Sequence, residues 1–385
     1  MFHRQLQLSP HRSSFLFGAR GTGKSTHLRR SLPESETHFV NLLEPDTEES
    51  LSRDPRLLER EVLALPTSVS TVVVDEVQKA PRLLDVVHNL IETHRVPQRF
   101  VLTGSSARKL RRGGANLLAG RASMRSLFPL VTGELGSDFD ESIALRFGGL
   151  PTVWNAHSDA DRIDYLRAYA QTYLREEIRL EQAVRRIEPF RRFLEVSAQS
   201  SGKVLNYASI ARDVGGDPKT VEAWFGVLED TLIGYHLDAY HSSVRKQLQK
   251  APKFYLFDVG VARALGFMLN VTPHPGTAYF GELFEHLVIG EVRARNAYEE
   301  RDWRLSYLLT KDGVEIDLVV QRPAQPLALI EIKSADLVRD DHATNLLRFA
   351  DDFPDADLFL FSRDPRPKQL GRVRALPWRD GIQAI

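Results

Sequence analysis

One stretch near the start of the chain has the residue types and spacing of a phosphate-binding loop. The segment Gly18–Thr26 reads GARGTGKST and lies between the apolar run Phe15–Phe17 and the helix-like segment His27–Arg30. Glycines let the backbone wrap a phosphate, successive N–H groups form an anion cradle, and the positive end of the next helix adds to the attraction. We expect Lys24 to reach the β- and γ-phosphates and the Ser25 hydroxyl to hold Mg²⁺. The predicted nucleotide-binding residues are Gly18, Ala19, Arg20, Gly21, Thr22, Gly23, Lys24, Ser25 and Thr26.

Two adjacent acids form a second candidate element. Thr71–Val74 is β-branched and apolar, which predicts a buried parallel strand, and Asp75 and Glu76 follow it directly. They would lie at the carboxyl edge of a parallel sheet, where ligands bind in α/β proteins. In an enzyme with a phosphate-binding loop, Asp75 would hold the metal through water and Glu76 would polarise the attacking water.

A further set of charged residues lies in the last third of the chain. Asp317 falls in one predicted strand, and Glu331 and Lys333 share one face of the next. Two carboxylates and an ammonium on facing strands can hold a divalent metal and position water against a phosphodiester. Glu285, on the preceding predicted helix, offers a third carboxylate.

Composition limits the classes of function. The 385 residues suffice for two or three domains, and 42% hydrophobic and 26% charged residues are ordinary for a globular protein. The absence of cysteine excludes disulfides, thiolate zinc sites and cysteine nucleophiles. No apolar run is long enough to span a bilayer and no signal-peptide pattern is present, so we expect a cytoplasmic protein without a membrane partner. With a net charge of zero, any nucleic-acid binding must come from local patches.

The order of predicted elements indicates an α/β fold followed by helices and an α+β part. Strand and helix signals alternate over the first 150 residues, which predicts a parallel sheet covered by helices. Helical, charged sequence follows from Asp159 to Glu188, and Tyr165, Tyr169 and Tyr173 form a stripe that we interpret as a packing face. Predicted strands of the first part are Ser14–Phe17, His38–Leu42, Thr71–Val74, Arg99–Thr103 and Met124–Leu127.

A helix-turn-helix signal lies near the middle of the chain. The helix-like segment Tyr207–Val214 ends at Gly215, and Asp217 and Pro218 open a second helix. A strand at Tyr235–Tyr240 follows, and with the basic run Arg245, Lys246, Lys250 and Lys253 it is typical of a wing. The sequence leaves open whether this wing contacts DNA or is a packing or protein-contact module.

The C-terminal part alternates helix and strand with its own apolar pattern. We therefore predict a P-loop domain at 1–155, a helical lid at 156–190, a winged-helix domain at 191–255 and an α+β domain at 256–385. Its predicted elements are a helix at Phe280–Arg295, strands at Leu305–Leu309, Val314–Val320 and Leu327–Lys333, a helix at His342–Phe349 and a strand at Asp357–Phe361.

The chain resembles a family of prokaryotic ATPases that join an AAA+-like P-loop domain to a winged helix and a C-terminal domain of restriction-endonuclease-like (PD-(D/E)xK) fold. In the nuclease-like signature, Asp317 matches the strand acid, Glu331 the second acid, Lys333 the lysine and Glu285 the acid of the first helix, while Ile316 replaces the usual proline. The motifs that carry the wider resemblance are GARGTGKST at 18–26, VVVDEVQKAP at 72–81, LTGSSARKL at 102–110, LLAGRASMRSLFPL at 117–130, GGLP at 148–151, FYLFDVGVARAL at 254–265, GELFEH at 281–286, EIDLVV at 315–320 and IEIKSA at 330–335.

The resemblance implies roles for further residues. Ser105 stands where these ATPases place the polar sensor of the γ-phosphate, with Thr103 as the alternative. Arg121 stands where they place an arginine finger, which acts on the neighbouring subunit's nucleotide and implies a homo-oligomer such as a hexameric ring. A lid arginine is also implied, and the sequence does not decide between Arg167 and Arg175.

The resulting expectation is an ATP- and Mg²⁺-dependent machine that acts on DNA, including branched or junction DNA. Two alternatives stay open from the sequence. One is a regulatory ATPase switch that binds a protein partner through its C-terminal domain, and the other is an ATP-dependent nuclease whose cleavage depends on Asp317.

Overall fold

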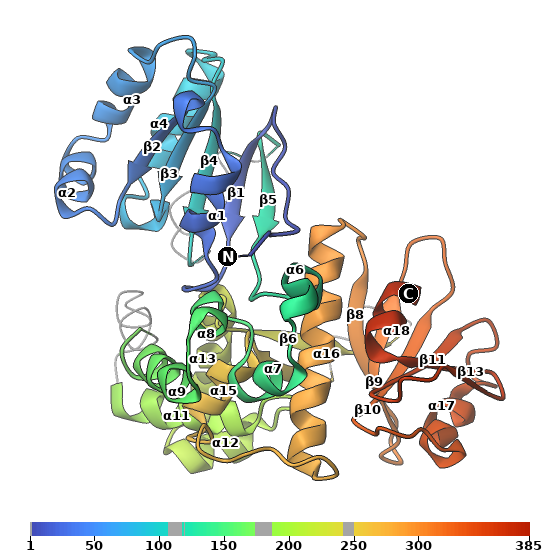
Figure 1. The fold of residues 1–385 in the computed structure, drawn as a ribbon. Coiled ribbons are helices and arrows are strands. Elements are labelled where there is room, and N and C mark those ends of the chain that lie inside the picture. The colour runs from blue at the N-terminus through green and yellow to red at the C-terminus, as the bar shows by residue number, and fades with distance from the viewer. Residues whose placement is uncertain (1, 107–117, 119, 174–186, 242–249) are drawn as a thin grey trace.

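The fold consists of a parallel sheet with its helices, a group of short helices, and a mixed sheet, arranged around one long helix (Figure 1). The long helix, α16 (Ala278–Tyr298), runs between the short helices and the mixed sheet. The computed structural model describes residues 2–106, 118, 120–173, 187–241 and 250–385.

The first sheet has five parallel strands in the spatial order β2-β3-β4-β1-β5. Continuous apolar runs such as Val72–Val74 are buried on both faces, as a parallel sheet covered by helices requires. All five predicted strands form, with ends within two residues of the predicted ones. They are β1 (Ser13–Phe17), β2 (Thr37–Asn41), β3 (Thr71–Asp75), β4 (Arg99–Gly104) and β5 (Ala122–Ser126).

Helices cover the two faces of this sheet. On one face, Leu58, Leu83 and Leu90 pack on the strands, and on the other Leu28 packs beside Leu6 of the segment that precedes β1. The helices are α1 (Lys24–Ser31), η1 (Glu34–Glu36), α2 (Pro45–Arg53), α3 (Arg56–Leu63), η2 (Val77–Lys79) and α4 (Leu83–Glu92).

The second part consists of short helices around one hydrophobic core. This core includes residues from Phe147 to Leu269, so it packs together side chains from both sides of each predicted boundary at 155, 190 and 255. The domain limits therefore stay a prediction. The helices are α6 (Thr132–Leu135), η4 (Gly136–Asp138), α7 (Glu141–Phe147), α8 (Pro151–Asn155), α9 (Asp159–Ala168), the π-helix η5 (Tyr169–Tyr173), α11 (Ile187–Gln199), α12 (Tyr207–Val214), α13 (Pro218–Asp230) and α15 (Val259–Leu265).

The predicted pair of helices in the middle of the chain forms as α12 and α13. Asn206 caps α12, which ends at Gly215 with a φ of 71° that suits glycine. Asp217 caps α13 by accepting a hydrogen bond from the Thr220 N–H. The two helices pack against each other and are followed by an antiparallel pair of strands, β6 (Gly234–Ala239) and β7 (Lys253–Leu256).

The mixed sheet contains eight strands in the order β12-β13-β11-β10-β9-β8-β6-β7. Because β6 pairs in parallel with β8, the β6–β7 pair extends this sheet. The other elements are β8 (Arg304–Leu309), β9 (Glu315–Gln321), β10 (Ala328–Lys333), η6 (Asp340–Ala343), α17 (Thr344–Phe349), β11 (Asp357–Ser362), β12 (Lys368–Leu370), β13 (Val373–Pro377) and α18 (Trp378–Ala384).

The helix α16 makes polar contacts with parts that are distant in sequence. Both oxygens of Glu291 bond to Thr132 at the start of α6. Near its end, the Tyr298 hydroxyl accepts a hydrogen bond from the Phe128 N–H, 3.1 Å away. One helix thus joins the first sheet to the mixed sheet.

Candidate functional site

The glycine-rich segment forms the loop between β1 and α1, at the carboxyl edge of the first sheet. Gly21 and Gly23 have φ values of 82° and 91°, in the left-handed region that glycine adopts without strain. A Cβ on Gly18 would lie 2.5 Å from the Leu127 carbonyl oxygen, so the loop also needs glycine for close approach. The loop opens into a cavity of about 1670 Å³ that Lys24, Ser25 and other residues line.

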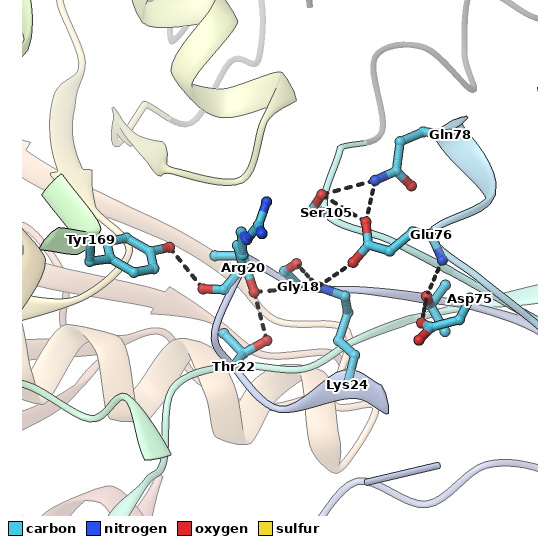
Figure 2. A network of polar contacts seen from close by, with 11 residues as sticks. Gly18, Arg20, Thr22, Lys24, Asp75, Glu76, Gln78, Ser105 and Tyr169 are labelled. Carbon is cyan, nitrogen blue, oxygen red and sulfur yellow. Dashed lines mark hydrogen bonds and ion pairs between the residues drawn. The ribbon is translucent and has the colours of Figure 1, made fainter. Parts of the chain in front are cut away.

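Lys24 points back across the loop that precedes it (Figure 2). Its ammonium donates to the carbonyl of Gly18 at 2.8 Å and lies 3.8 Å from Glu76 Oε1. The Thr22 hydroxyl donates to the Ala19 carbonyl at 2.8 Å, which closes the turn. The loop therefore holds its cation beside the acids of β3, as the sequence predicts.

Asp75 and Glu76 lie at the end of β3, and Thr103 of the neighbouring β4 ties them together. The Thr103 hydroxyl donates to Asp75 Oδ1 at 2.5 Å and accepts from the Glu76 N–H at 2.9 Å. Asp75 is buried, with 1% of its surface exposed. Thr103, the alternative sensor, is thus a contact of the predicted metal-holding acid.

Ser105, the other predicted sensor, contacts Glu76 (Figure 2). Its hydroxyl donates to Glu76 Oε2 at 3.1 Å, and Gln78 Nε2 donates both to Ser105 Oγ, at 3.0 Å, and to Glu76 Oε2. Glu76 has a φ of 60°, which is uncommon for a residue with a side chain and is found at functional sites. Two polar side chains therefore fix the direction of the predicted catalytic carboxylate.

The residues around this loop fit a magnesium ion. Ser25 lies at the start of α1 on the cavity wall, and Asp75 supplies a buried carboxylate at the adjacent strand end. Hydroxyl and carboxylate oxygens are the ligands that Mg²⁺ prefers, usually together with water and phosphate oxygens.

Two residues that the sequence did not indicate as site residues, Arg4 and Tyr169, contact the phosphate loop. The buried Arg4 donates to the Thr22 carbonyl at 2.6 Å and to the Phe128 carbonyl at 2.5 Å, and Arg4 Nε lies 3.0 Å from a Glu134 carboxylate oxygen. The Tyr169 hydroxyl donates to the Arg20 carbonyl at 2.8 Å (Figure 2). Tyr169 belongs to the stripe interpreted as packing only, so this interpretation missed its contact with the loop.

The two candidate arginines that the structure describes, Arg121 and Arg167, do not lie at the loop. Arg121 lies before β5, and because Ser13 is paired with Ala122, it is at the amino edge of the sheet, about 15 Å or one strand length from the loop. Its guanidinium pairs with Glu92. Arg167 bonds to Asn270 at 3.1 Å, and Arg175 lies outside the described residues.

The predicted C-terminal residues come together with a lysine from β7. Lys253 lies 3.0 Å from Glu285 Oε1 and also pairs with Glu315. The Tyr255 hydroxyl donates to the same Glu285 oxygen at 2.6 Å. We call Lys253, Glu285, Glu315, Asp317, Glu331 and Lys333 the charge cluster.

Within the charge cluster, Asp317 of β9 and Glu331 of β10 are buried. Asp317 accepts from the Ile332 N–H at 2.7 Å, and Lys333 Nζ lies 2.6 Å from Glu331 Oε1. Burial raises the pKa of Asp317 well above its usual range, and the charges of Glu285 and Glu331 act in the same direction. Burial also raises the pKa of Glu331, although Lys333 opposes this.

The charge cluster does not fit a metal ion as the sequence expects. In the described part of the chain, no three His, Asp or Glu side chains are placed to hold a metal together. Instead, the ammonium of Lys253 lies between two carboxylates, with 3% of its side chain exposed. The expectation that Lys253 belongs to a DNA-contacting wing is wrong, because that side chain is buried; Arg245 and Lys246 lie outside the described residues.

The order of the five strands, the loop geometry and a family match agree for the first part of the chain. Residues 10–136 match the family described as "AAA domain". The first part of the chain is therefore similar to proteins of that family. Two further stretches match families described only as domains of unknown function, DUF8612 at residues 139–274 and DUF4143 at residues 280–380.

The similar proteins do not indicate an activity for this chain. The chain is 28% identical over 325 residues to the uncharacterized proteins Rv2008c of Mycobacterium tuberculosis and Mb2031c of Mycobacterium bovis, which covers 83% of this chain and 69% of theirs. Among solved structures, it has 12% identity and a TM-score of 0.19 to the McrB AAA+ hexamers with bound McrC of Thermococcus gammatolerans, over 48% of this chain and 70% of that one. It has 10% identity and a TM-score of 0.26 to the DNA clamp loader delta protein (YqeN) of Bacillus subtilis, over 73% and 95%. Neither likeness is close enough to transfer a function.

No helix in the described ranges has the length and apolar character required to cross a membrane.

Proposed function

We propose that this chain is a Mg²⁺-dependent ATP hydrolase of the AAA+ type. The observation that carries the proposal is the convergence of Lys24, Ser25, Asp75 and Glu76 on one edge of the parallel sheet, with the Glu76 carboxylate held by two hydrogen bonds. A carboxylate fixed beside a phosphate-binding lysine is what in-line attack by water on a γ-phosphate requires.

Each residue has a defined part in this proposal. Lys24 binds the β- and γ-phosphates and offsets their charge, and Glu76 accepts a hydrogen bond from the attacking water and so orients it. Ser105 and Gln78 keep Glu76 in that direction. Ser25 and Asp75 would hold Mg²⁺, which when bound neutralises negative charge on the phosphates.

We propose further that the ATPase works as an oligomeric ring. The Arg121 side chain is 37% exposed. It lies at the amino edge of the first sheet, and the phosphate loop of the same subunit lies at the carboxyl edge. At about 15 Å from the loop, its side chain is too distant to contact a nucleotide bound in the same subunit. An arginine in this place is suited to a nucleotide held by a neighbouring copy, with its pairing to Glu92 exchanged for phosphate on assembly.

The leading candidate for the substrate on which the ring acts is DNA, including branched or junction DNA. The support is the arrangement of α12 and α13, two capped helices joined by a short glycine turn, followed by the β6–β7 pair. Lys219, at the start of α13, is exposed and available to a phosphate.

A second candidate is an ATPase switch that binds a protein partner through its C-terminal domain. The charge cluster favours it, because four carboxylates face two lysines, and both lysines are already paired. Its partly exposed acids, Glu285 and Glu315, repel a phosphate backbone. The same pairing gives no support to metal-dependent cleavage, so we do not carry the nuclease alternative further.

ATP turnover by purified full chain, with and without single-stranded, duplex and four-way DNA, tests these proposals. Lys24→Ala should abolish tight ATP binding, whereas Glu76→Gln should keep binding and stop turnover. Wild-type turnover by Glu76→Gln would show that Glu76 is not the group that orients water.

The same experiment distinguishes the two candidates, DNA as the substrate of the ATPase and a protein partner bound through the C-terminal domain. If DNA is the substrate, it should stimulate turnover, and Lys219→Ala should shallow the log–log salt dependence of DNA binding by about one phosphate contact. Lys311→Ala, an exposed lysine in the β8–β9 turn, is the matched control. No binding to any of the DNA forms at low salt would leave the partner switch as the better reading.

A further inference from the structure

Two glycines of the phosphate loop leave the direction of their peptides open. Gly21 and Gly23 line the cavity, and because glycine has no side chain, it is their backbone that does so. Their φ values of 82° and 91° lie in a region that glycine reaches as readily as the mirror-image region. A loop of this kind binds phosphate through backbone N–H groups that point toward the anion. Contacts from outside the two glycines must therefore fix the direction of these N–H groups.

The peptide between Arg20 and Gly21 is the central peptide of a tight turn. The Thr22 N–H donates to the Ala19 carbonyl at 3.3 Å, and the φ of 82° at Gly21 is that of the third residue of a type II turn. Type I and type II turns differ mainly by a flip of this central peptide, and glycine at the third position permits both. The Arg20 carbonyl and the Gly21 N–H exchange sides when the turn changes its type.

Tyr169 holds this peptide in one of its two orientations. Its hydroxyl donates to the Arg20 carbonyl at 2.8 Å, and Figure 2 shows it on the opposite side of the loop from Glu76. The peptide is trans, so its N–H points opposite to its C=O. The Gly21 N–H therefore points away from Tyr169, toward the side of the loop on which Glu76 lies. Tyr169 is itself held in place, because it is 1% exposed and its ring packs beside that of Phe257.

Arg4 acts in the same way on the peptide between Thr22 and Gly23. Its guanidinium donates to the Thr22 carbonyl at 2.6 Å, so the Gly23 N–H points away from Arg4. Arg4 is 9% exposed, and its Nε lies 3.0 Å from a carboxylate oxygen of Glu134, which fixes its position. Two buried side chains from distant parts of the sequence thus each bind the carbonyl that precedes one of the two glycines.

We infer that Tyr169 and Arg4 are positioning residues of the phosphate loop, which turn the Gly21 and Gly23 N–H groups toward the phosphates. If either peptide were flipped, a carbonyl oxygen would face the phosphates in place of an N–H group and would repel them. Because the peptides are already oriented, nucleotide binding does not have to order them, which favours affinity. The inference rests on the proposed nucleotide site and adds the residues that prepare its loop.

Calorimetry with inorganic tripolyphosphate and with ATP measures the effect on the full chain. Tripolyphosphate tests the loop without a contribution from base or sugar. Tyr169→Phe and Arg4→Lys should each weaken both ligands by about three- to tenfold, the effect of one lost hydrogen bond. Lysine keeps the positive charge beside Glu134, but its single ammonium cannot replace a guanidinium that reaches several acceptors at once.

Each variant has a matched control in the mixed sheet. Tyr307→Phe also removes a tyrosine hydroxyl that donates to a backbone carbonyl, that of Ala251 at 2.6 Å. Arg322 is 8% exposed, donates to the Pro326 carbonyl and pairs with Asp357, so Arg322→Lys is the corresponding change of a buried arginine. The controls should lower the urea midpoint of unfolding as the variants do, while both affinities stay within about twofold of wild type.

Amide NMR spectra of the full chain, labelled selectively at glycine, report on each peptide separately. On saturation with tripolyphosphate, the Gly21 and Gly23 amide protons of the wild type should move downfield, because they donate to charged oxygens. Tyr169→Phe should reduce the shift of Gly21 and keep that of Gly23, and Arg4→Lys should do the reverse. A merely structural role would diminish both shifts together in either variant, and that result would overturn the inference.

The outcomes separate this inference from the proposed ATPase. If wild-type protein binds neither ATP nor tripolyphosphate, the proposed function fails together with the inference. If it binds either one, and both variants bind that ligand as tightly as wild type, the positioning roles are wrong and the phosphate site stands. Equal losses of affinity in the variants and in their controls would also count against the positioning roles alone.

Discussion

Lys253 is the residue on which the charge cluster most depends. Its ammonium lies 3.0 Å from Glu285 Oε1 and pairs with Glu315, and only 3% of its side chain is exposed. Lys253→Met keeps the length and apolar character of the chain and removes the charge, so the two carboxylates then face each other uncompensated. Removing one partner of a buried ion pair costs about 3–5 kcal/mol. Because the Glu285 and Glu315 side chains are 20% and 33% exposed, water compensates part of this, and we expect a loss of about 2–3 kcal/mol.

Urea unfolding of the full chain measures that loss, with tryptophan fluorescence as the signal because Trp303 and Trp378 pack in the C-terminal core. Lys250→Met, an exposed lysine three residues away, is the matched control and should change stability by less than about 0.5 kcal/mol. Adding Glu285→Gln to Lys253→Met should recover part of the loss, since one of the two repelling charges is gone. If Lys253→Met unfolds at the same urea concentration as the control, Lys253 does not hold the cluster together.

Three further substitutions probe the other sites. Arg121→Ala should retain nucleotide binding and lower turnover by about 10³-fold, and mixing it with Lys24→Ala should restore part of the activity if the arginine acts on a neighbour; full activity in a strictly monomeric protein would contradict the ring. Tyr169→Phe removes one hydrogen bond to the phosphate loop and should lower the free energy of unfolding in urea by about 0.5–1.5 kcal/mol, and it should raise KM for ATP because the loop is held less firmly. Burial raises the pKa of Glu291 to about 7, so native protein keeps a proton that the unfolded chain loses above its ordinary pKa, and stability should fall between pH 4.5 and 7. Glu291→Gln keeps the contacts with Thr132 and should flatten that part of the pH profile; an unchanged slope would assign it to other groups.

The parts of the site that are contiguous in sequence could be predicted from it. The loop Gly18–Thr26 and the pair Asp75–Glu76 each follow directly from a strand, so their place at the carboxyl edge of a parallel sheet is fixed by local pattern. The first sheet was predictable for the same reason, because long apolar runs between turn signals leave few alternatives. Ser105 and Thr103 also lie at this edge, and the structure adds that each holds a different acid.

The residues that reach the sites through tertiary structure could not be predicted. Arg4 contacts Thr22 from the segment before β1, and Tyr169 comes from a helix about 150 positions further on. The sequence around each has no motif that marks it. Lys253 shows how a local pattern misleads: it follows a run of basic residues typical of a solvated wing, yet pairing of β7 with β6 brings it against Glu285 on α16.

The two charged centres of the molecule are joined by one helix, and this constrains how they influence each other. Glu285, near the start of α16, belongs to the charge cluster, and Tyr298, at its end, accepts a hydrogen bond from Arg4, which in turn holds the phosphate loop. Thirteen helical steps lead from Glu285 to Tyr298, about 20 Å at 1.5 Å per residue. Arg4 contacts both the phosphate loop and the end of α16, so we expect a displacement of the loop to act first on the contact between Arg4 and Tyr298.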